Sequence, residues 1–179
     1  ENGKELERLD ELEGLAYLND IKSDLHMHTT WSDGAHSVAE MGQALIDRGY
    51  SYAVITDHSQ YLKVANGLTP ERLQNQKNDI YEFNAANEGF TLYRGTEMDI
   101  LPDGSLDFDD EVLRDLDFVI ASIHSSFTQP VETIMERLHN AISNPYVHMI
   151  AHPTGRIIGK RGGYEIDVPQ LIDWAAQYD

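Results

Sequence analysis

The chain has 179 residues, of which 41% are hydrophobic, and this predicts one globular domain with its own hydrophobic core. Its formal net charge of −18 argues against a free-standing nucleic-acid-binding protein, because affinity for phosphate backbones comes from clustered Lys and Arg, so a polyanionic substrate would need metal cations or a partner domain. Zero cysteines exclude disulfides and thiolate metal sites, so any metal must be held by His, Asp and Glu.

The chain opens with a charged segment, residues 1–20, which we interpret as a leader or linker from an upstream region, with residues 21–179 forming the folded domain. This start is too charged for a signal peptide, and no apolar run approaches the roughly 18 to 20 residues of a membrane span. We therefore expect a cytoplasmic protein without a membrane partner.

Four segments show the periodicity and the end signals of helices. In the first, residues 37–49, Ser37 and Glu40 have the spacing of a capping box and Gly49 ends the apolar pattern. The other three combine a start signal or Pro with apolar residues at near-helical spacing. They are residues 69–89, 130–142 and 168–179.

Five short runs between these helices are apolar and rich in β-branched or aromatic residues, as in buried parallel strands. They are residues 24–28, 52–58, 90–97, 117–124 and 147–152. Strands that alternate with helices imply βα units, and therefore an α/β barrel or an open doubly wound sheet.

Each predicted strand ends in a residue type that binds metals: His28, His58, Glu97, His124 and His152. The carboxyl ends of parallel barrel strands share one face, so these side chains would converge there. His26 lies two residues before His28 and would share its strand face, while Asp33 follows a short turn later. The pattern predicts a metal site.

The predicted ligands also indicate the chemistry. Nitrogen and oxygen donors without sulfur suit Zn²⁺, Mn²⁺ or Fe²⁺, and seven candidates exceed the needs of one tetrahedral ion. A central carboxylate such as Glu97 could bridge two ions about 3.5 to 4 Å apart, lower the pKa of a shared water and clamp a phosphoryl or carbonyl group. Phosphoester hydrolysis would then need no protein nucleophile.

Several nearby residues have a structural and a functional interpretation. Arg156, Lys160 and Arg161 form a basic cluster after the last predicted strand, where they would either contact a substrate phosphate or lie in a solvated loop. Asp57 and Ser125 adjoin candidate ligands and could orient their imidazoles.

The remaining histidines are assigned no metal. His36 lies in the loop before a helix, His139 beside the apolar stripe of its helix and facing solvent, and His148 at the start of a strand, where a structural role is expected.

The motifs DLHMHT, SDG, ITDH, GTEMD, ASIHS and AHP, in this order, resemble those of the PHP (polymerase and histidinol phosphatase) family. DLHMHTTWSDG, DILPDGSLDFDDEVL, DFVIASIHSSF and AHPTGRIIGKRGGYEID are similar to the C-terminal PHP domain of bacterial family X DNA polymerases. The resemblance implies a distorted seven-stranded β/α barrel with a trinuclear site, usually of manganese or zinc, with iron as an alternative. It also implies Mn²⁺-dependent 3′-to-5′ exonuclease activity and related processing of DNA ends or abasic sites.

The same resemblance divides the candidate ligands among three ions. It places His26 and His28 on the first, His124 and His152 on the second, Asp33 and His58 on the third, and Glu97 as the bridge between the first and second. Family members continue with further strands and an Asp-x-His pair, which this chain lacks after His152. We therefore expect a piece of a longer protein, cut before the barrel closes, whose open strand edges favour self-association.

Three other functions remain open from the sequence. The first is a stand-alone phosphatase of a small phosphomonoester such as histidinol phosphate. The second is an amidohydrolase, a class that also begins with His-x-His but does not need His58 and Glu97. The third is a non-catalytic barrel that positions or regulates a neighbouring polymerase.

Overall fold

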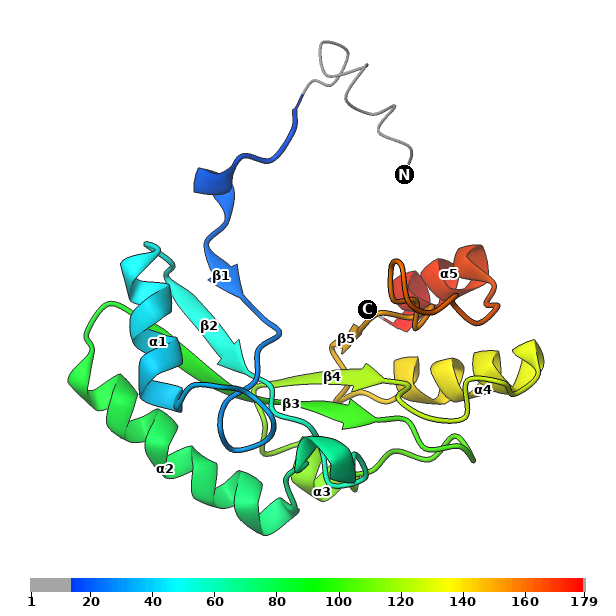
Figure 1. Cartoon of the computed structure of the whole chain (residues 1–179), viewed down its shortest axis with the longest axis horizontal. Coiled ribbons are helices and arrows are strands. Elements are labelled where there is room, and N and C mark those ends of the chain that lie inside the picture. The colour runs from blue at the N-terminus through cyan, green and yellow to red at the C-terminus, as the bar shows by residue number, and fades with distance from the viewer. Residues whose placement is uncertain (1–13, 179) are drawn as a thin grey trace.

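Five parallel strands, hydrogen-bonded to one another in chain order, form the frame of the protein in this computed structural model, which describes residues 14–178 (Figure 1). They are β1 (Ser23–Asp24), β2 (Tyr52–Ile55), β3 (Thr91–Asp99), β4 (Phe118–Ser122) and β5 (Met149–Ile150). Parallel neighbours require crossover connections, and helices or loops supply them. The sheet curves into an open half-barrel, which confirms the predicted α/β class.

The four predicted helices are all present. They are α1 (Val38–Asp47), α2 (Pro70–Ala86), α4 (Val131–Ile142) and α5 (Val168–Tyr178). The short helix α3 (Asp110–Leu113) and the 3₁₀ turns η2 (Leu18–Asp20) and η3 (Lys63–Ala65) were not predicted. At the start of α1 the expected capping box forms: the Glu40 amide donates to Ser37 Oγ over 3.3 Å and the Ser37 amide to the Glu40 carboxylate over 2.8 Å.

Two hydrophobic clusters hold the helices on the sheet. One joins α1 and α2 to the amino-terminal strands, and there Gly42 is required because a Cβ atom would lie 2.4 Å from the Phe83 ring. The other packs α4 against β3 and β4 through fully buried residues such as Met98, Val119 and Leu138. Burial on both sides fixes the strands so that their carboxyl ends form one edge.

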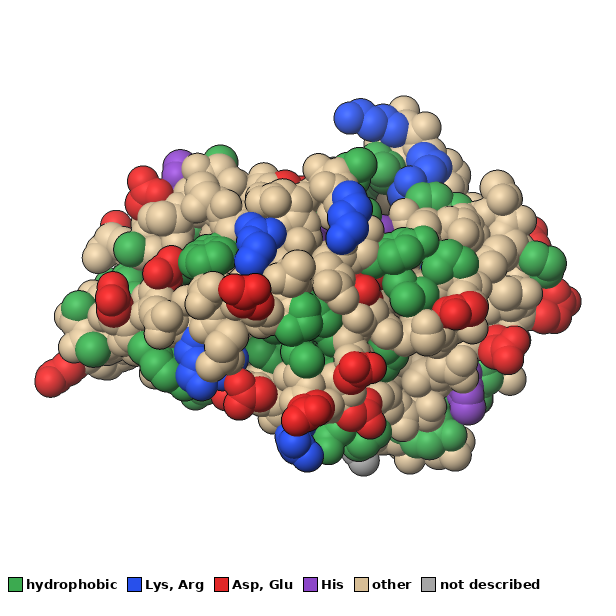
Figure 2. Space-filling view, turned by 90° about the horizontal axis from the view of Figure 1, so that it is seen from below, with side chains coloured by type: hydrophobic (Ala, Val, Ile, Leu, Met, Phe, Trp, Pro, Cys, Tyr) green, Lys and Arg blue, Asp and Glu red, His purple; other side chains and the backbone are tan. Residues whose placement is uncertain are grey.

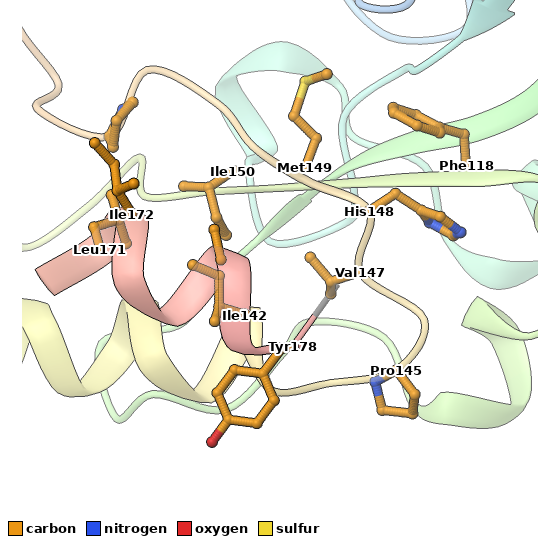
Figure 3. A pocket seen from close by; sticks show the side chains of 12 residues that line it. Phe118, Ile142, Pro145, Val147, His148, Met149, Ile150, Leu171, Ile172 and Tyr178 are labelled. Atoms are coloured by element: carbon orange, nitrogen blue, oxygen red, sulfur yellow. The ribbon is translucent and has the colours of Figure 1, made fainter. Parts of the chain in front are cut away.

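The helix α5 leaves part of its apolar face uncovered. Leu171 is buried, whereas Ile172 next to it is 62% exposed. Together with the outer strand β5, the helix lines an apolar groove of about 620 Å³ (Figure 3), whose wall includes Met149 and Ile150. The groove therefore runs along a strand that has a sheet neighbour on one side within the described residues.

Acidic side chains are spread over the molecular surface rather than gathered in one patch on the face that Figure 2 shows.

Only part of the expected leader, residues 1–20, lies within the described residues, and residues 14–20 are exposed and lead away from the sheet (Figure 1). Within the described residues, no helix has the length and apolar character needed to cross a membrane.

Candidate metal centre

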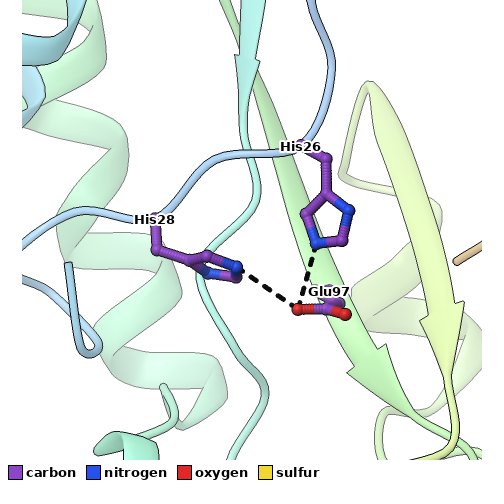
Figure 4. Close-up of side chains that lie close together, drawn as sticks. All are labelled: His26, His28 and Glu97. Atoms are coloured by element: carbon purple, nitrogen blue, oxygen red, sulfur yellow. Dashed lines mark ion pairs between the residues drawn. The ribbon is translucent and has the colours of Figure 1, made fainter. Parts of the chain in front are cut away.

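One buried carboxylate, that of Glu97 in β3, forms the middle of the candidate site. It is 1% exposed, and imidazoles from four other segments contact its two oxygens. Oε2 lies 3.1 Å from His26 Nε2 and 3.4 Å from His28 Nε2 (Figure 4), and 3.1 Å from His58 Nδ1, while Oε1 lies 3.3 Å from His124 Nε2 and 2.8 Å from His152 Nε2. The predicted convergence of these residues is therefore seen in the structure.

Asp33 joins the site at its outer side. It is half exposed, and its Oδ1 lies 3.8 Å from His58 Nε2, so that the His58 ring stands between Asp33 and Glu97. The His28 ring stacks on the His58 ring with centroids 4.2 Å apart. One imidazole thus faces two carboxylates through its two nitrogens.

Three groups of side chains in the described residues have ligand atoms within 4.8 Å of one another. They are His26 with His28 and Glu97, His28 with Asp33 and His58, and His58 with Glu97 and His124. The three groups share members, and their nitrogen and oxygen donors are of the kinds that Mn²⁺, Zn²⁺ or Fe²⁺ bind. His152 belongs to none of these groups, although it contacts Glu97.

The prediction that each ligand ends its strand is wrong in detail. Only Glu97 lies within a strand. His58 forms an isolated parallel bridge with Glu97 beyond the end of β2, and the other histidines lie in the loops that follow β1, β4 and β5. After β1, regular pairing gives way because the Thr56 hydroxyl accepts a hydrogen bond from the Met27 amide, at 2.9 Å, in place of a backbone carbonyl. The Thr56 amide still donates to the Met27 carbonyl at 2.9 Å, which holds the paired histidines beside β2.

His152 has a backbone φ of +28°, a left-handed conformation that a residue with a Cβ rarely adopts. Such conformations cost about 1 to 3 kcal/mol and gather at functional sites. The rest of the fold therefore holds His152 against Glu97 at a local energetic cost.

Hydrogen bonds and burial shift the pKa values of the central groups in opposite directions. Burial raises the pKa of Glu97, but hydrogen bonds from His124, His152 and His26 outweigh it and leave the pKa well below the ordinary value. Burial lowers the pKa of His124, but hydrogen bonds to Asp99 and Glu97 raise it to about 9. The hydrogen bond to Glu97 also raises the pKa of His26. Without metal the centre therefore holds protons that metal binding would release.

Burial dominates at His58, whose pKa is lowered. A neutral imidazole keeps a lone pair available for a cation, so His58 is ready to serve as a ligand near neutral pH.

Two residues that the sequence analysis did not select support the centre. Asp99 is fully buried, and its Oδ2 lies 3.2 Å from His124 Nδ1, so the other ring nitrogen faces Glu97. The Ser122 hydroxyl donates to Glu97 Oε1 at 2.8 Å. Period-two alternation on β3 was the missed signal, since Asp99 lies two residues after Glu97 and shares its strand face.

Asp57 does not orient an imidazole, so the prediction for it is wrong. Its buried carboxylate accepts hydrogen bonds from the Thr29 amide and hydroxyl at 2.7 and 2.6 Å, from the Ser32 hydroxyl at 2.5 Å and from Gln76 at 2.5 Å. It therefore fixes the loop that follows the paired histidines. The Ser125 hydroxyl forms no hydrogen bond to an imidazole either, because it is buried without a hydrogen-bond partner within the described residues.

Arg156, Lys160 and Arg161 are exposed in the loop between β5 and α5. Arg161 is partly structural, because it donates to the Gly155 carbonyl at 2.7 Å and its guanidinium lies 4.3 Å from the centre of the Phe127 ring. These contacts fasten the loop beside the strand that leads to the centre. Their role toward substrate remains a prediction.

The three remaining histidines lie outside the centre. His36 lies in the loop before α1, as predicted, and is exposed. His148 accepts a hydrogen bond from the Val119 amide at 3.1 Å through Nδ1, which confirms a structural role. His139 is only partly exposed to solvent, because its ring lies 4.6 Å from the Trp174 ring of α5.

A parallel α/β sheet whose carboxyl edge gathers histidines around a buried carboxylate is the arrangement of a metal-binding α/β domain. The sequence model of the PHP domain matches residues 24–174, and the chain belongs to the PHP family. It is 59% identical, over 98% of its length, to the DNA polymerase/3′-5′ exonuclease PolX of Bacillus subtilis, of which it spans 31%.

Other relatives carry a different name. The chain is 30% identical, over 87% of its length, to a probable phosphatase of Thermoanaerobacter sp. and covers 60% of that protein. It is 35% identical, over 73% of its length, to a probable phosphatase of Acetivibrio thermocellus and covers 53% of that protein. The chain thus spans about a third of the polymerase and between half and two thirds of these phosphatases.

Proposed function

We propose that this domain is a metal-dependent phosphoesterase that processes DNA ends, as a Mn²⁺-dependent 3′-to-5′ exonuclease within a protein like the bacterial family X polymerases. The observation that carries the proposal is the contact of five imidazoles with the buried Glu97 carboxylate. The 59% identity to PolX favours DNA as the substrate over a small phosphomonoester.

Each part of the centre has a proposed task. His26 and His28 would hold a first ion, His124 and His152 a second, and Asp33 and His58 a third, with Glu97 as a ligand shared by the first two. Bound Mn²⁺ or Zn²⁺ supplies a water of lowered pKa and neutralises the phosphate charge. Because a metal-bound water would be the nucleophile, no nucleophilic side chain is required.

DNA would bind this acidic domain through the bound metal ions and through the basic loop that carries Arg156, Lys160 and Arg161. Arg156 is the proposed phosphate contact nearest the centre in sequence, with Lys160 and Arg161 binding the strand further along. Residues 1–20 are the proposed connection to an upstream polymerase core, and the proposed location, which rests on the proposed DNA substrate, is the bacterial cytoplasm.

The test uses a 5′-labelled oligonucleotide with Mn²⁺ in the buffer. We expect shortening from the 3′ end by the wild-type chain and its loss in His124→Ala, with His36→Ala as the matched control because His36 is exposed and lies outside the centre. Nuclease activity that survives His124→Ala would exclude this centre as its source.

The phosphatase named in several relatives is the second candidate function. Hydrolysis of histidinol phosphate or p-nitrophenyl phosphate at a higher kcat/KM than the oligonucleotide would favour it. If the metal-loaded chain hydrolyses neither substrate class, a non-catalytic module that positions a polymerase becomes the better account.

We also propose that two copies of the chain associate through the groove beside β5. Its apolar walls and the open strand edge would be covered by the same face of a second copy. Sedimentation should show a dimer that Ile172→Glu converts to monomer, while Val64→Glu, at a site that is 94% exposed on η3, leaves it unchanged. A monomeric wild-type chain at all concentrations would exclude this association.

A further inference from the structure

Arg137, in the middle of α4, places a guanidinium in the interior of the protein. Its side chain is 1% exposed and makes three hydrogen bonds, all to uncharged oxygens. One nitrogen donates to the Ile100 carbonyl over 2.5 Å, and the other donates to the Ser125 carbonyl over 3.2 Å and to the Gln129 side-chain oxygen over 2.7 Å. Among residues 14–178, no carboxylate forms an ion pair with it.

The two carbonyls belong to segments that carry the candidate centre. Ile100 directly follows Asp99 at the end of β3, and Ser125 directly follows His124 in the loop after β4. The guanidinium therefore joins the residue after Asp99 to the residue after His124, and the side chains of Asp99 and His124 lie 3.2 Å apart. A rigid planar fork with donors on two nitrogens suits such bridging better than a flexible ammonium group.

Stability alone does not account for this side chain. Burial lowers the pKa of Arg137, which reflects the cost of placing its charge among apolar residues. Its Nε donor is also buried without a partner in the described part of the chain, and such a donor carries a further desolvation cost. What the residue provides in return is a fixed spacing between two loops.

We propose that Arg137 is a positioning residue of the metal centre: by joining the end of β3 to the loop after β4, it holds the His124 ring against Asp99 and toward Glu97. The inference concerns the geometry of a metal ligand and rests on the proposed function for the metal itself. It assigns Arg137 no contact with substrate.

The test compares Arg137→Lys with Arg94→Lys. Arg94 is a matched control, because it is also a largely buried arginine, at 8% exposure. It lies in β3 and donates to the Asp115 carbonyl at 2.9 Å, so it joins β3 to the segment before β4. Titration with Mn²⁺ and the visible absorption of bound Co²⁺ are measured for each full-length variant, together with thermal unfolding of the metal-free protein.

We expect Arg137→Lys to weaken metal affinity by roughly 10- to 100-fold, as loss of a group that orients a ligand does, and to alter the Co²⁺ spectrum. Arg94→Lys should lower the unfolding temperature without either change. Equal metal affinity and equal spectra in the two variants would overturn the proposal. If Arg137→Lys does not fold, Gln129→Ala, which removes one partner of the guanidinium, decides in its place: unchanged affinity would overturn the proposal.

A wild-type chain that binds no metal would refute the proposed function instead. Arg137 is then tested by hydrogen exchange of the metal-free protein. Amides of residues 123–129 should exchange faster in Arg137→Lys than in Arg94→Lys, and equal exchange would overturn the positioning role.

Discussion

Oδ2 of Asp99 lies 3.2 Å from Nδ1 of His124, and this contact turns the opposite nitrogen of the ring toward Glu97, at 3.3 Å. A carboxylate behind an imidazole fixes the orientation of the ring and makes it a stronger ligand. Because Asp99 is fully buried, water does not compete for this hydrogen bond. The strand β3 thus supplies both the central carboxylate and the group that orients one of its partners.

Replacing Asp99 by Asn should weaken metal binding while preserving the fold. Asn has nearly the same volume, but its neutral amide no longer stabilises the His124 ring as the carboxylate does, so we expect a 10- to 100-fold loss in metal affinity or in activity. Isothermal titration with Mn²⁺ measures the loss. Asp103→Asn, in an exposed position of the following loop, is the control. Equal affinities in the two variants would show that Asp99 has no such role.

Replacing Asp57 by Asn should lower the free energy of unfolding, because the Asp57 side chain holds the loop after His28 and forms no hydrogen bond to a candidate metal ligand within the described residues. Its carboxylate accepts hydrogen bonds from Thr29, Ser32 and Gln76. In the Asn variant the side-chain NH₂ group would replace one of these acceptor oxygens, so that a donor would face donors. Loss of hydrogen bonds to a buried charge costs about 1.5 to 3 kcal/mol each, so we expect the free energy of unfolding in urea to fall by about 2 to 4 kcal/mol. A change below about 0.5 kcal/mol, the usual effect of surface substitutions, would contradict this account of the loop.

The sequence allowed the alternation of strands and helices to be predicted because each helix carries its own capping and periodicity signals. Ser37 and Glu40 form the expected capping box, and the carboxyl ends of parallel strands necessarily meet at one edge. The gathering of His28, His124 and Glu97 could therefore be predicted from strand order alone.

The supporting groups could not be predicted with equal ease, since they depend on tertiary packing. Asp57 is next to a candidate ligand in sequence, yet its side chain enters the interior and meets Gln76 of α2. In the sequence, Arg137 occupies what looks like a polar position of an amphipathic helix. The fold shows that it is buried, with hydrogen bonds to the segments after β3 and β4. The ends of four strands were placed too late, whereas β3 continues two residues past Glu97 to Asp99. After β1 the Thr56 side chain takes the place of a backbone partner, which the sequence does not reveal.

The metal-free chain should lose stability as the pH rises from about 6.5 to 9. The pKa of His124 is raised from 6.5 to about 9 in the folded state, so its stabilising contribution is complete below the lower value and disappears as the pH passes the upper one. Thermal unfolding in the presence of a chelator measures this trend. His124→Asn should flatten it, and a variant that retains the full decline would assign the effect to other groups.

The number of bound ions tests whether the three ligand groups act together. Glu97 belongs to two of the groups, and His28 and His58 connect these two to the third, so we expect more than one ion per wild-type chain after growth with manganese and zinc. Glu97→Gln should reduce the content to one ion or fewer, because a neutral amide neither bridges two cations nor balances their charge. Elemental mass spectrometry of the purified chains measures both values. Glu132→Gln, an exposed position on α4, controls for the loss of one negative charge, and an equal metal content in the two variants would exclude Glu97 as the bridging ligand.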